Sequence, residues 1–570
     1  MDAGLHRLDR HFPVRLLAWA LCIAAALGGA ASEWLWGTGG VLALAGGALA
    51  LLGWHDRRQT RRSVLRNYPV IGHLRFLMEF IRPEIRQYFI ESDSEAAPFS
   101  RQQRSLVYQR AKGDPDKRPF GSQRDMQAAG HEWLNHSMLP TELPSHDFRV
   151  RIGHSGNGCL QPYSASVFNI SAMSFGALSA RAIEALNAGA RKGGFAHDTG
   201  EGSVSEHHRS GGGDLIWEIG SGYFGCRDAA GAFCEDRFVA NARQPQVKMI
   251  EIKLSQGAKP GHGGVLPGPK VTAEIAAARG VPEGVDCISP ARHAAFDTPR
   301  ELLQFVARLR RLSGGKPVGF KLCIGHPWEW FAICKAMMAS DILPDFIVVD
   351  GAEGGTGAAP LEFTDHVGAP LQEGLLLVHN TLTGLGLRPR IQIGCAGKLI
   401  GAFDIARAMA LGADWCNSAR GFMFALGCIQ AQTCHSGACP TGVATQDPKR
   451  QQALVVDDKA ERVWRYHQNT LHALRELVQA AGLQHPGEIS AAHIVRRGTD
   501  GTVRLLSNLL PFVPLGSLLP AAEGRGDWPL PVFSHYWPMA DPDSFAPRRP
   551  GFDAPHPTQA HRPSPASIHP

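Results

Sequence analysis

The stretch Asp345–Gly357, DFIVVDGAEGGTG, sets the expectation for the fold of the chain. It begins with a short, continuous apolar run, FIVV, which predicts a strand buried on both faces, as in a parallel sheet. It ends in GAEGGTG, and the glycines let the backbone approach a ligand closely. The stretch therefore predicts a strand whose carboxyl end lines a ligand site.

The same pattern, an apolar strand followed by a glycine-rich loop, recurs through the middle of the chain. Helix-like runs such as 179–194 and 401–413 lie between these segments. Strand–helix alternation of this kind predicts a parallel sheet, and a (β/α)8 barrel builds its active site at such strand ends. We therefore predict an α/β fold, a TIM barrel over residues 149–499. The predicted strands are 167–176, 247–254, 318–325, 345–357, 390–397 and 413–421.

The composition is that of a globular protein with a sizeable core. Of 570 residues, 44% are hydrophobic and 19% are charged, and 64 are glycine. The net charge of +6 is small for this length, so we expect no nucleic-acid partner. A lone G-x-G-x-x-G at 220–225 does not predict a dinucleotide site, because another glycine turn follows it where a helix should begin.

Two uncharged runs near the N-terminus, 16–31 and 37–54, predict a pair of transmembrane helices within residues 1–66. Arginines precede the first run and follow the second, whereas the connection between them has none. The positive-inside rule then places both ends in the cytoplasm, with the barrel on the cytoplasmic side of the inner membrane. A cleaved signal peptide is the alternative for the first run.

The remaining segments are expected to surround the barrel. Residues 67–148 read as a juxtamembrane helix followed by a polar covering segment, and 500–570 as a C-terminal extension. The extension ends in a proline-rich tail from residue 546 onward, which predicts disorder.

Three cysteines lie close together in the loop 427–440, with the spacing C-x5-C-x4-C: Cys428, Cys434 and Cys439. In a reducing cytoplasm, clustered thiols favour metal or redox chemistry over disulfides. Three thiolates suit an iron–sulfur cluster that lacks one corner, since structural zinc takes four ligands. A zinc site that also uses His435, or inert buried thiols, stay open at this point.

Five stretches then combine into a resemblance. They are NISAMSFGALS (169–179), DTGEGS (198–203), EIKLSQGAKPGHGG (251–264), GAEGGTGAAP (351–360) and GCIQAQTCHSGACPTGVATQDP (427–448). Together, over roughly residues 150–450, they resemble the FMN-binding synthase domain of bacterial glutamate synthases. The resemblance implies a (β/α)8 barrel that carries FMN beside a [3Fe-4S] cluster, with Cys428, Cys434 and Cys439 as the cluster ligands.

The resemblance also implies which residues hold the flavin. Lys321 would lie at its pyrimidine edge, where a cation stabilises the reduced anion; an ordinary salt-bridged lysine is the alternative. Glycine loops and strand ends would take the ring and the phosphate. The implied residues are Met173, Ser174, Phe175 and Gly176 for the ring, with Gly354, Gly355, Ala396, Gly397, Ser418, Ala419 and Arg420 in the other cofactor loops.

For the substrate, the resemblance implies catalytic roles for Glu201 and Lys259, with Gln256 and Lys259 binding the keto acid. A lysine suits a carboxylate, and a buried carboxylate can handle the ammonia proton. Both residues could instead only support their loops. The sequence departs from the family pattern at His262 and Val265, where the family has an acid and a glutamine.

Tyr223 is a third departure, since it stands where the family has an arginine. These changes put 2-oxoglutarate in doubt as the substrate. Asp2 occupies the place of the family's nucleophilic cysteine, so we expect the nitrogen to come from free ammonia or a separate amidotransferase.

The expected function is therefore reductive amination of a 2-keto acid, 2-oxoglutarate to glutamate, by an FMN and iron–sulfur oxidoreductase. The electron donor would be ferredoxin-like, an NAD(P)H-dependent subunit or a membrane carrier. The alternatives are a flavin-dependent hydroxy or amino acid dehydrogenase, and a non-catalytic electron-transfer module in the membrane.

Overall fold

The computed structural model describes residues 14–59, 62–90, 92 and 97–548. The chain divides into two compact units, residues 1–100 and residues 101–570. Most of the predicted proline-rich tail, 549–570, lies outside the described residues, as do residues 1–13.

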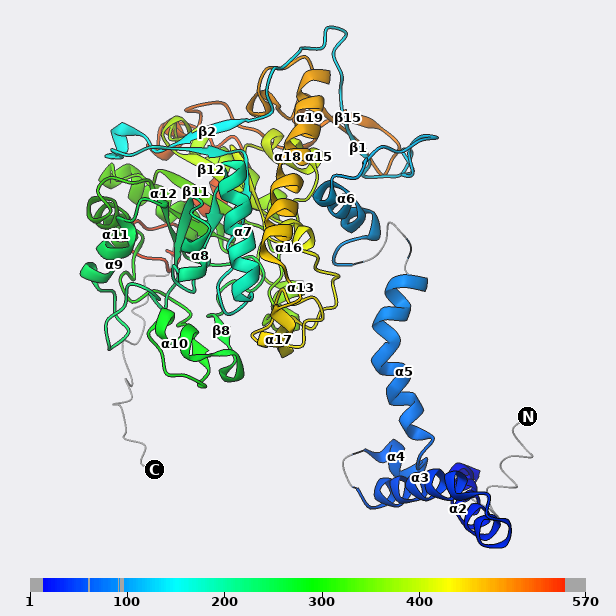
Figure 1. Cartoon of the computed structure of the whole chain (residues 1–570). Coiled ribbons are helices and arrows are strands. Elements are labelled where there is room, and N and C mark those ends of the chain that lie inside the picture. The colour runs from blue at the N-terminus through cyan, green and yellow to red at the C-terminus, as the bar shows by residue number, and fades with distance from the viewer. Residues whose placement is uncertain (1–13, 60–61, 91, 93–96, 549–570) are drawn as a thin grey trace. The chain divides into compact units, whose positions relative to one another are not determined.

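Eight parallel strands close into a barrel in the second unit (Figure 1). Each pairs with the next in chain order, and the last pairs with the first, Cys416 opposite Phe168. This confirms the predicted (β/α)8 class. The strands are β4 (Phe168–Ile170), β5 (His197–Asp198), β6 (Leu215–Ile219), β7 (Val247–Lys253), β10 (Val318–Leu322), β11 (Phe346–Asp350), β12 (Gln392–Ala396) and β13 (Trp415–Ser418).

Helices connect the strands and cover the outside of the barrel. The two helix-like runs of the sequence form α7 and α15. Ser179 is the N-cap of α7, and its side chain accepts a hydrogen bond from the N–H of Ala182. The helices between β4 and the end of the barrel are α7 (Ala180–Gly193), α8 (Glu206–Ser210), α9 (Glu235–Ala242), α10 (Ala273–Arg279), α11 (Pro299–Leu312), α12 (Pro327–Ser340), α13 (Leu361–His366), α14 (Leu371–Gly384), α15 (Ala402–Ala410) and α16 (Arg420–Leu426).

Further elements pack around this frame. The long helix α18 (Val456–Ala480) lies against α7 and against α6 (Arg101–Lys112), a helix inside the segment that the sequence suggested only as a polar covering. The other elements are β1 (Glu132–Leu134), β2 (Arg149–Ile152), β3 (Tyr163–Ser166), β8 (Val265–Leu266), β9 (Cys287–Ile288), α17 (Pro448–Gln451), β14 (Ile494–Arg497), β15 (Val503–Leu505), α19 (Leu506–Leu509), α20 (Leu519–Ala522) and α21 (Pro531–Tyr536).

The part of the barrel interior nearer the amino ends of the strands is an apolar core. Side chains of the strands meet there with Ile152 and Tyr163 of the β2–β3 hairpin. Its members from the strands are Ile216, Met249, Phe346, Val348 and Trp415, joined by Ala196 directly before β5.

A polar layer lies one step further toward the carboxyl ends of the strands. Side chains of a strand alternate between its two faces, so the residue two positions after each core residue also points inward. The sequence places polar residues at most of these positions, and they are buried or nearly so. The layer consists of Asn169, Asp198, Glu218, Glu251, Lys321, Asp350, Ala396 and Asn417.

The first unit is built on a helical hairpin, α2 (Leu17–Trp36) and α3 (Gly40–Arg58), followed by α4 (Ser63–Asn67), α5 (Gly72–Ile85) and the turn of π-helix Arg86–Ile90. The two long helices pack closely because a Cβ at Gly29 would lie 2.5 Å from the Ala43 nitrogen, and one at Gly46 would lie 2.6 Å from that of Ala26. Such small-residue contacts are typical of membrane helix pairs.

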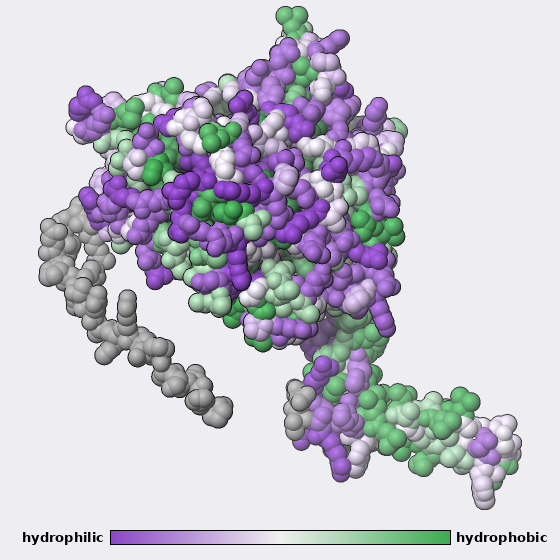
Figure 2. Space-filling model, turned by 60° about the vertical axis from the view of Figure 1, so that its left-hand side comes forward, coloured by the Kyte–Doolittle hydropathy of each residue, from purple (hydrophilic) through white to green (hydrophobic). Residues whose placement is uncertain are grey.

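Apolar side chains cover the outer surface of this hairpin (Figure 2). Of the described helices, α2 alone is long and apolar enough to cross a membrane, by length and composition. The second predicted span does form a helix, α3, but this helix does not meet the same criterion. One such helix is weak support for membrane association.

Candidate functional site

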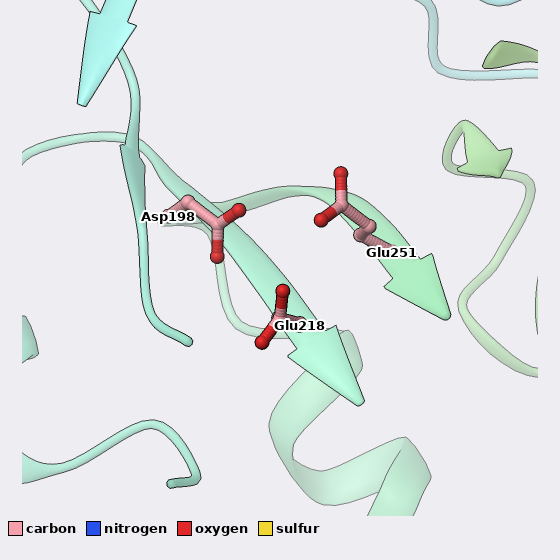
Figure 3. A group of neighbouring side chains, drawn as sticks. All are labelled: Asp198, Glu218 and Glu251. Atoms are coloured by element: carbon pink, nitrogen blue, oxygen red, sulfur yellow. The ribbon is translucent and has the colours of Figure 1, made fainter. Parts of the chain in front are cut away.

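The centre of the polar layer is a cluster of three carboxylates, Asp198, Glu218 and Glu251, which extend toward one another from β5, β6 and β7 (Figure 3). One oxygen of each lies within 4.8 Å of the others, and all three residues are at most 2% exposed. Lys321 from β10 pairs with Glu218, and its Nζ lies 3.5 Å from Oε1 of Glu251. Lys321 therefore forms ion pairs within the cluster, and its contact with the flavin stays a prediction.

Three buried acids and one buried cation cannot all be ionised without excess negative charge. Burial and the neighbouring Glu218 raise the pKa of Asp198 to about 7. Burial and Asp198 raise the pKa of Glu251 well above its ordinary value. Burial alone would lower the pKa of Lys321, but the surrounding carboxylates raise it well above the usual lysine range. The cluster therefore holds a lysine ammonium and at least one carboxylic acid proton near neutral pH.

Asp350 connects this cluster to the GAKPG loop. Its Oδ2 accepts a hydrogen bond of 2.9 Å from the N–H of Gly257, which fixes the start of the loop against the end of β11. Burial raises the pKa of Asp350, while Lys321 opposes that rise.

The predicted substrate residues meet around a lysine that the sequence analysis missed, Lys253. Its Nζ lies 3.2 Å from Oε1 of Glu201 and donates to Oε1 of Gln256 at 3.0 Å. The glutamate carboxylate fits between glycine backbones, since a Cβ at Gly264 would lie 2.2 Å from it and one at Gly220 would lie 2.8 Å from it.

Glu201 is held in its ionised form. Burial would raise its pKa, but Lys253, Arg279 and Lys259 together lower it below the ordinary value. The buried carboxylate can therefore accept a proton and cannot serve as a resident acid.

Lys259 lies close enough for its charge to act on Glu201, but its own hydrogen bond goes elsewhere. Its Nζ donates to the carbonyl of Gly263 at 3.1 Å. Burial lowers the pKa of this lysine, partly offset by Glu201. The structure therefore brings Glu201 and Gln256 together directly through Lys253, with Lys259 beside them.

A sequence signal for Lys253 did exist. In β7 the inward positions alternate, so Met249, Glu251 and Lys253 share one face. Arg279 had no such signal, because it ends helix α10, far from the strands in sequence. Its Nη2 donates to the Phe175 carbonyl at 3.1 Å.

The three departures from the family pattern have different environments. Tyr223 is fully buried, and its hydroxyl contacts Nδ1 of His293 at 3.1 Å and accepts from the N–H of Ala295 at 3.0 Å. His262 is exposed and bonds the carbonyl of the next residue. Val265 pairs with Ile288 in the short β8–β9 ribbon.

The opposite side of the barrel mouth carries the loops predicted for the cofactor, at the ends of the adjoining strands β11, β12, β13 and β4. Met173 and Phe175 are buried there. A Cβ at Gly354 would lie 3.5 Å from the Gly351 carbonyl oxygen, and one at Gly355 would lie 3.9 Å from Nη2 of Arg420, so this loop packs at ordinary contact distances.

Arg420, the first residue of α16, reaches over the same loop, with Nη2 3.4 Å from the Gly355 carbonyl. Ala396 and Gly397 follow on the neighbouring strand, and Ala419 precedes Arg420. Ser418 has a structural partner, since its hydroxyl donates to the Leu399 carbonyl at 2.6 Å.

The cysteine loop lies against these cofactor loops. The N–H of Cys428 donates to the Met423 carbonyl at 3.0 Å, and a Cβ at Gly357 would lie 3.2 Å from Cβ of Cys434. Cys428 and Cys439 are buried and Cys434 is partly exposed.

The thiols of this loop differ in acidity. Burial raises the pKa of Cys428 to about 11. Burial also acts on Cys439, but hydrogen bonds from Thr441 and nearby N–H groups lower its pKa below the ordinary value. In the described part of the chain, these three sulfurs are not all within 4.8 Å of one another.

Comparison with known proteins shows the family of the chain. Residues 160–484, more than half of the chain, match the model of the conserved region in glutamate synthase. The chain belongs to the glutamate synthase family. It is a glutamate synthase-like oxidoreductase.

Two relatives show how the family match is distributed. The glutamate synthase large subunit-like protein YerD of Bacillus subtilis (strain 168) is 39% identical over 507 residues, which is 81% of this chain and 95% of YerD. An archaeal glutamate synthase (NADPH) of Methanocaldococcus jannaschii is 38% identical over 315 residues, 55% of this chain and 58% of its own length. The chain thus matches nearly all of YerD but little more than half of the archaeal protein.

Among solved structures, a mutant flavocytochrome b2 aligns with 79% of this chain and 97% of its own at 11% identity, with a TM-score of 0.40. A fit of this quality says nothing about what either protein binds.

Proposed function

We propose that this glutamate synthase family member is an FMN-dependent enzyme that reductively aminates a 2-keto acid, with 2-oxoglutarate as the first candidate. The observation that carries the proposal is the arrangement at the charged side of the barrel mouth. The Glu201 carboxylate pairs with Lys253, which shares a face of β7 with Glu251 of the buried acidic cluster.

The residues present fit FMN. The Arg420 guanidinium, with Nη2 3.4 Å from the Gly355 carbonyl, is a cation that could bind a phosphate, and Met173 to Gly176 lie in the loop after β4. When bound, FMN would supply the two-electron chemistry. Asn417, whose buried Oδ1 has no hydrogen-bond partner among the described residues, offers a further polar contact.

In this proposal, basic side chains bind the substrate. Lys253 and Lys259 are the cations that would bind the carboxylates of the keto acid, and Gln256 adds an amide. Tyr223 contributes no free polar group, because its hydroxyl is already bonded.

The reaction needs protons as well as electrons. Written with 2-oxoglutarate, the keto acid, one ammonium, two electrons and two protons give glutamate and water. Ionised Glu201 would take the proton that ammonium must lose before its nitrogen can attack the carbonyl carbon. The Asp198–Glu218–Glu251 cluster would hold a proton for the reduction step, with Lys321 fixing the carboxylates.

The cysteine loop would carry the [3Fe-4S] cluster. Structural zinc takes four ligands, whereas three thiolates suit an iron–sulfur cluster that lacks one corner and binds each thiolate through a different iron. The contact of the cysteine loop with the Gly357 loop would bring electrons close to the flavin side.

The source of the electrons and of the nitrogen is part of the proposal. The donor would be a ferredoxin-like protein, an NAD(P)H-dependent subunit or a membrane carrier, and the nitrogen would be free ammonium or come from a separate amidotransferase. Residues 1–66 would anchor the barrel to the cytoplasmic face of the inner membrane.

The test uses the purified full chain with a chemical reductant. We expect FMN, about three irons and no stoichiometric zinc per chain, and glutamate formation from 2-oxoglutarate with ammonium but not with glutamine. Cys434→Ser should lose the iron signal and keep the flavin. Zinc without iron would overturn the cluster assignment. Turnover of a hydroxy acid, or no turnover with any keto acid, would overturn the reductive amination.

A further inference from the structure

Among the loops that follow β4, β5 and β6, a cavity of about 380 Å³ is lined by four arginines from different elements. Arg209 comes from α8, Arg227 from the loop after β6, Arg237 from α9 and Arg279 from α10. We call it the arginine pocket. Its lining does not include Glu201, Gln256 or Lys259, so it is a different space from the proposed substrate site.

The guanidinium groups of the arginine pocket donate hydrogen bonds to neutral groups. Arg209 donates to the Val204 carbonyl and Asn241 Oδ1, and Arg237 donates to the Arg227 carbonyl. None of the four guanidinium groups forms an ion pair with an acidic residue in the described ranges, and the Nε atoms of Arg209, Arg227 and Arg279 are buried without a hydrogen-bond partner there. Two acids, Glu206 and Glu274, also line the pocket, but Glu274 bonds His207.

A second basic cavity provides a comparison for the contacts of these cations. It measures about 740 Å³ and lies at the other end of the barrel, lined by Arg243, Lys248 and Lys316 among others. There Lys316 donates to two backbone carbonyls, Lys248 faces Asp214 at 3.5 Å, and Arg243 donates to the Leu312 carbonyl. The larger cavity therefore has an acidic partner for one of its three cations, whereas the four arginines of the arginine pocket form no ion pair with a described acid.

The chemistry of the lining selects a class of ligand. Guanidinium groups present paired N–H donors that match the oxygens of a carboxylate or phosphate, and buried cations gain most from such a partner. The volume is within the range of small-molecule sites. We propose that the arginine pocket binds a small oxyanion that carries carboxylate or phosphate groups.

Arg279 connects the arginine pocket to the active site. Its Nη2 donates to the Phe175 carbonyl at 3.1 Å and lies 3.4 Å from the Ser174 hydroxyl, in the loop proposed to face the flavin. Its charge also contributes to keeping Glu201 ionised. An anion bound to the Arg279 guanidinium would weaken its hydrogen bonds to the β4 loop and its electrostatic effect on Glu201. Binding of the anion should therefore change the turnover rate. This coupling rests on the proposed function, but the binding does not.

Calorimetric titration of the full chain tests the binding without any activity. Inorganic phosphate and succinate are each added up to about 10 mM, where a millimolar site is saturated. We expect at least one of them to bind, and Arg227→Gln and the exposed Arg237→Gln each to weaken it about tenfold, as the loss of one charged contact should. Arg243→Gln is the matched control and should bind as the unaltered chain does.

The outcomes separate the sources and the sites. Binding of phosphate alone assigns a phosphate ligand, and binding of succinate alone assigns a dicarboxylate. The proposal fails if neither binds, or if Arg227→Gln and Arg237→Gln, folded by circular dichroism, bind as tightly as the control. It also fails if Lys259→Gln abolishes the heat signal, because the anion would then occupy the substrate site.

Discussion

The two sides of the barrel mouth differ in charge although they share one fold. Strands β5, β6, β7 and β10 end in Asp198, Glu218, Glu251 with Lys253, and Lys321, all close to one another. Strands β12, β13 and β4 carry neutral residues at the same level, Ala396, Asn417 and Asn169. The charged side can hold and move protons, whereas the neutral side is the one proposed to take the flavin.

The difference also separates two ways of stabilising a site. On the charged side each group depends on its neighbours, because a buried charge without a partner is costly. On the neutral side the loops depend on backbone packing and on one cation, Arg420. Substitutions on the charged side should therefore affect chemistry and folding more than those on the neutral side.

The largest effect is expected for Glu201→Gln. Loss of the proton acceptor should lower ammonium-dependent turnover about 10²–10⁴-fold, while FMN content stays unchanged. Steady-state rates with a chemical reductant measure this. Glu283→Gln, an exposed acid in the loop after α10, is the control. A loss below tenfold would show that the carboxylate only supports its loop.

Lys321→Met should have the next largest effect, on stability. Removing the cation leaves the buried acids without their positive partner and should lower the free energy of unfolding by about 3–5 kcal/mol. Adding Glu218→Gln should restore part of the loss, because one charge fewer is then buried. Chemical denaturation of the two variants measures both changes. No loss in Lys321→Met would mean that the carboxylates are already neutral.

Asp198→Asn should change how stability depends on pH. The folded pKa is about 7 against an ordinary value of 3.8, so folding binds a proton between these limits. The unaltered chain therefore loses stability relative to the variant as pH rises toward about 7, and the difference then stays constant. Thermal unfolding between about pH 5 and 8 measures this. The exposed Asp297→Asn should show no such trend.

On the neutral side, Arg420→Gln should weaken FMN binding about 10–100-fold, as expected for loss of a charged hydrogen bond. Riboflavin, which lacks the phosphate, should bind both forms equally. Fluorescence titration measures the two ligands. If riboflavin weakens as much as FMN, Arg420 acts through its contact with Met423 and not through the phosphate.

The sequence could predict the barrel because each apolar run followed by glycines is a local signal, as in β11 and β12. It could not reveal β5, which has only two residues, since His197–Asp198 carries no periodicity. Helix α6 was missed because its polar residues pack on α18, a partner far away in the sequence. Long-range packing also explains Arg279, whose position depends on how α10 folds back over the β4 loop.

The cofactor residues were predicted through resemblance, and the structure brings their loops to adjoining strands. Lys321 shows the limit of that approach. A family role gives the strand end, but the three acids around the lysine follow only from strand alternation across four strands. The sequence contains Asp198, Glu218 and Glu251, yet their meeting depends on the closure of the barrel.

The smallest effect is expected for Tyr223→Phe, which tests the support behind the charged side. The hydroxyl bonds His293 and the N–H of Ala295, and Nε2 of His293 lies 2.8 Å from the Lys253 carbonyl. Removing it should cost about 1 kcal/mol of stability, the usual net value of one hydrogen bond. If the chain of contacts positions Lys253, KM for the keto acid should rise up to about fivefold, the equivalent of the same energy, with kcat unchanged. Tyr536→Phe, whose hydroxyl has no hydrogen bond to a described residue, is the control and should change neither quantity. A fall in kcat with KM constant would instead place Tyr223 close to the reacting atoms, and the contrast between the two sides of the mouth would then extend beyond the cluster itself.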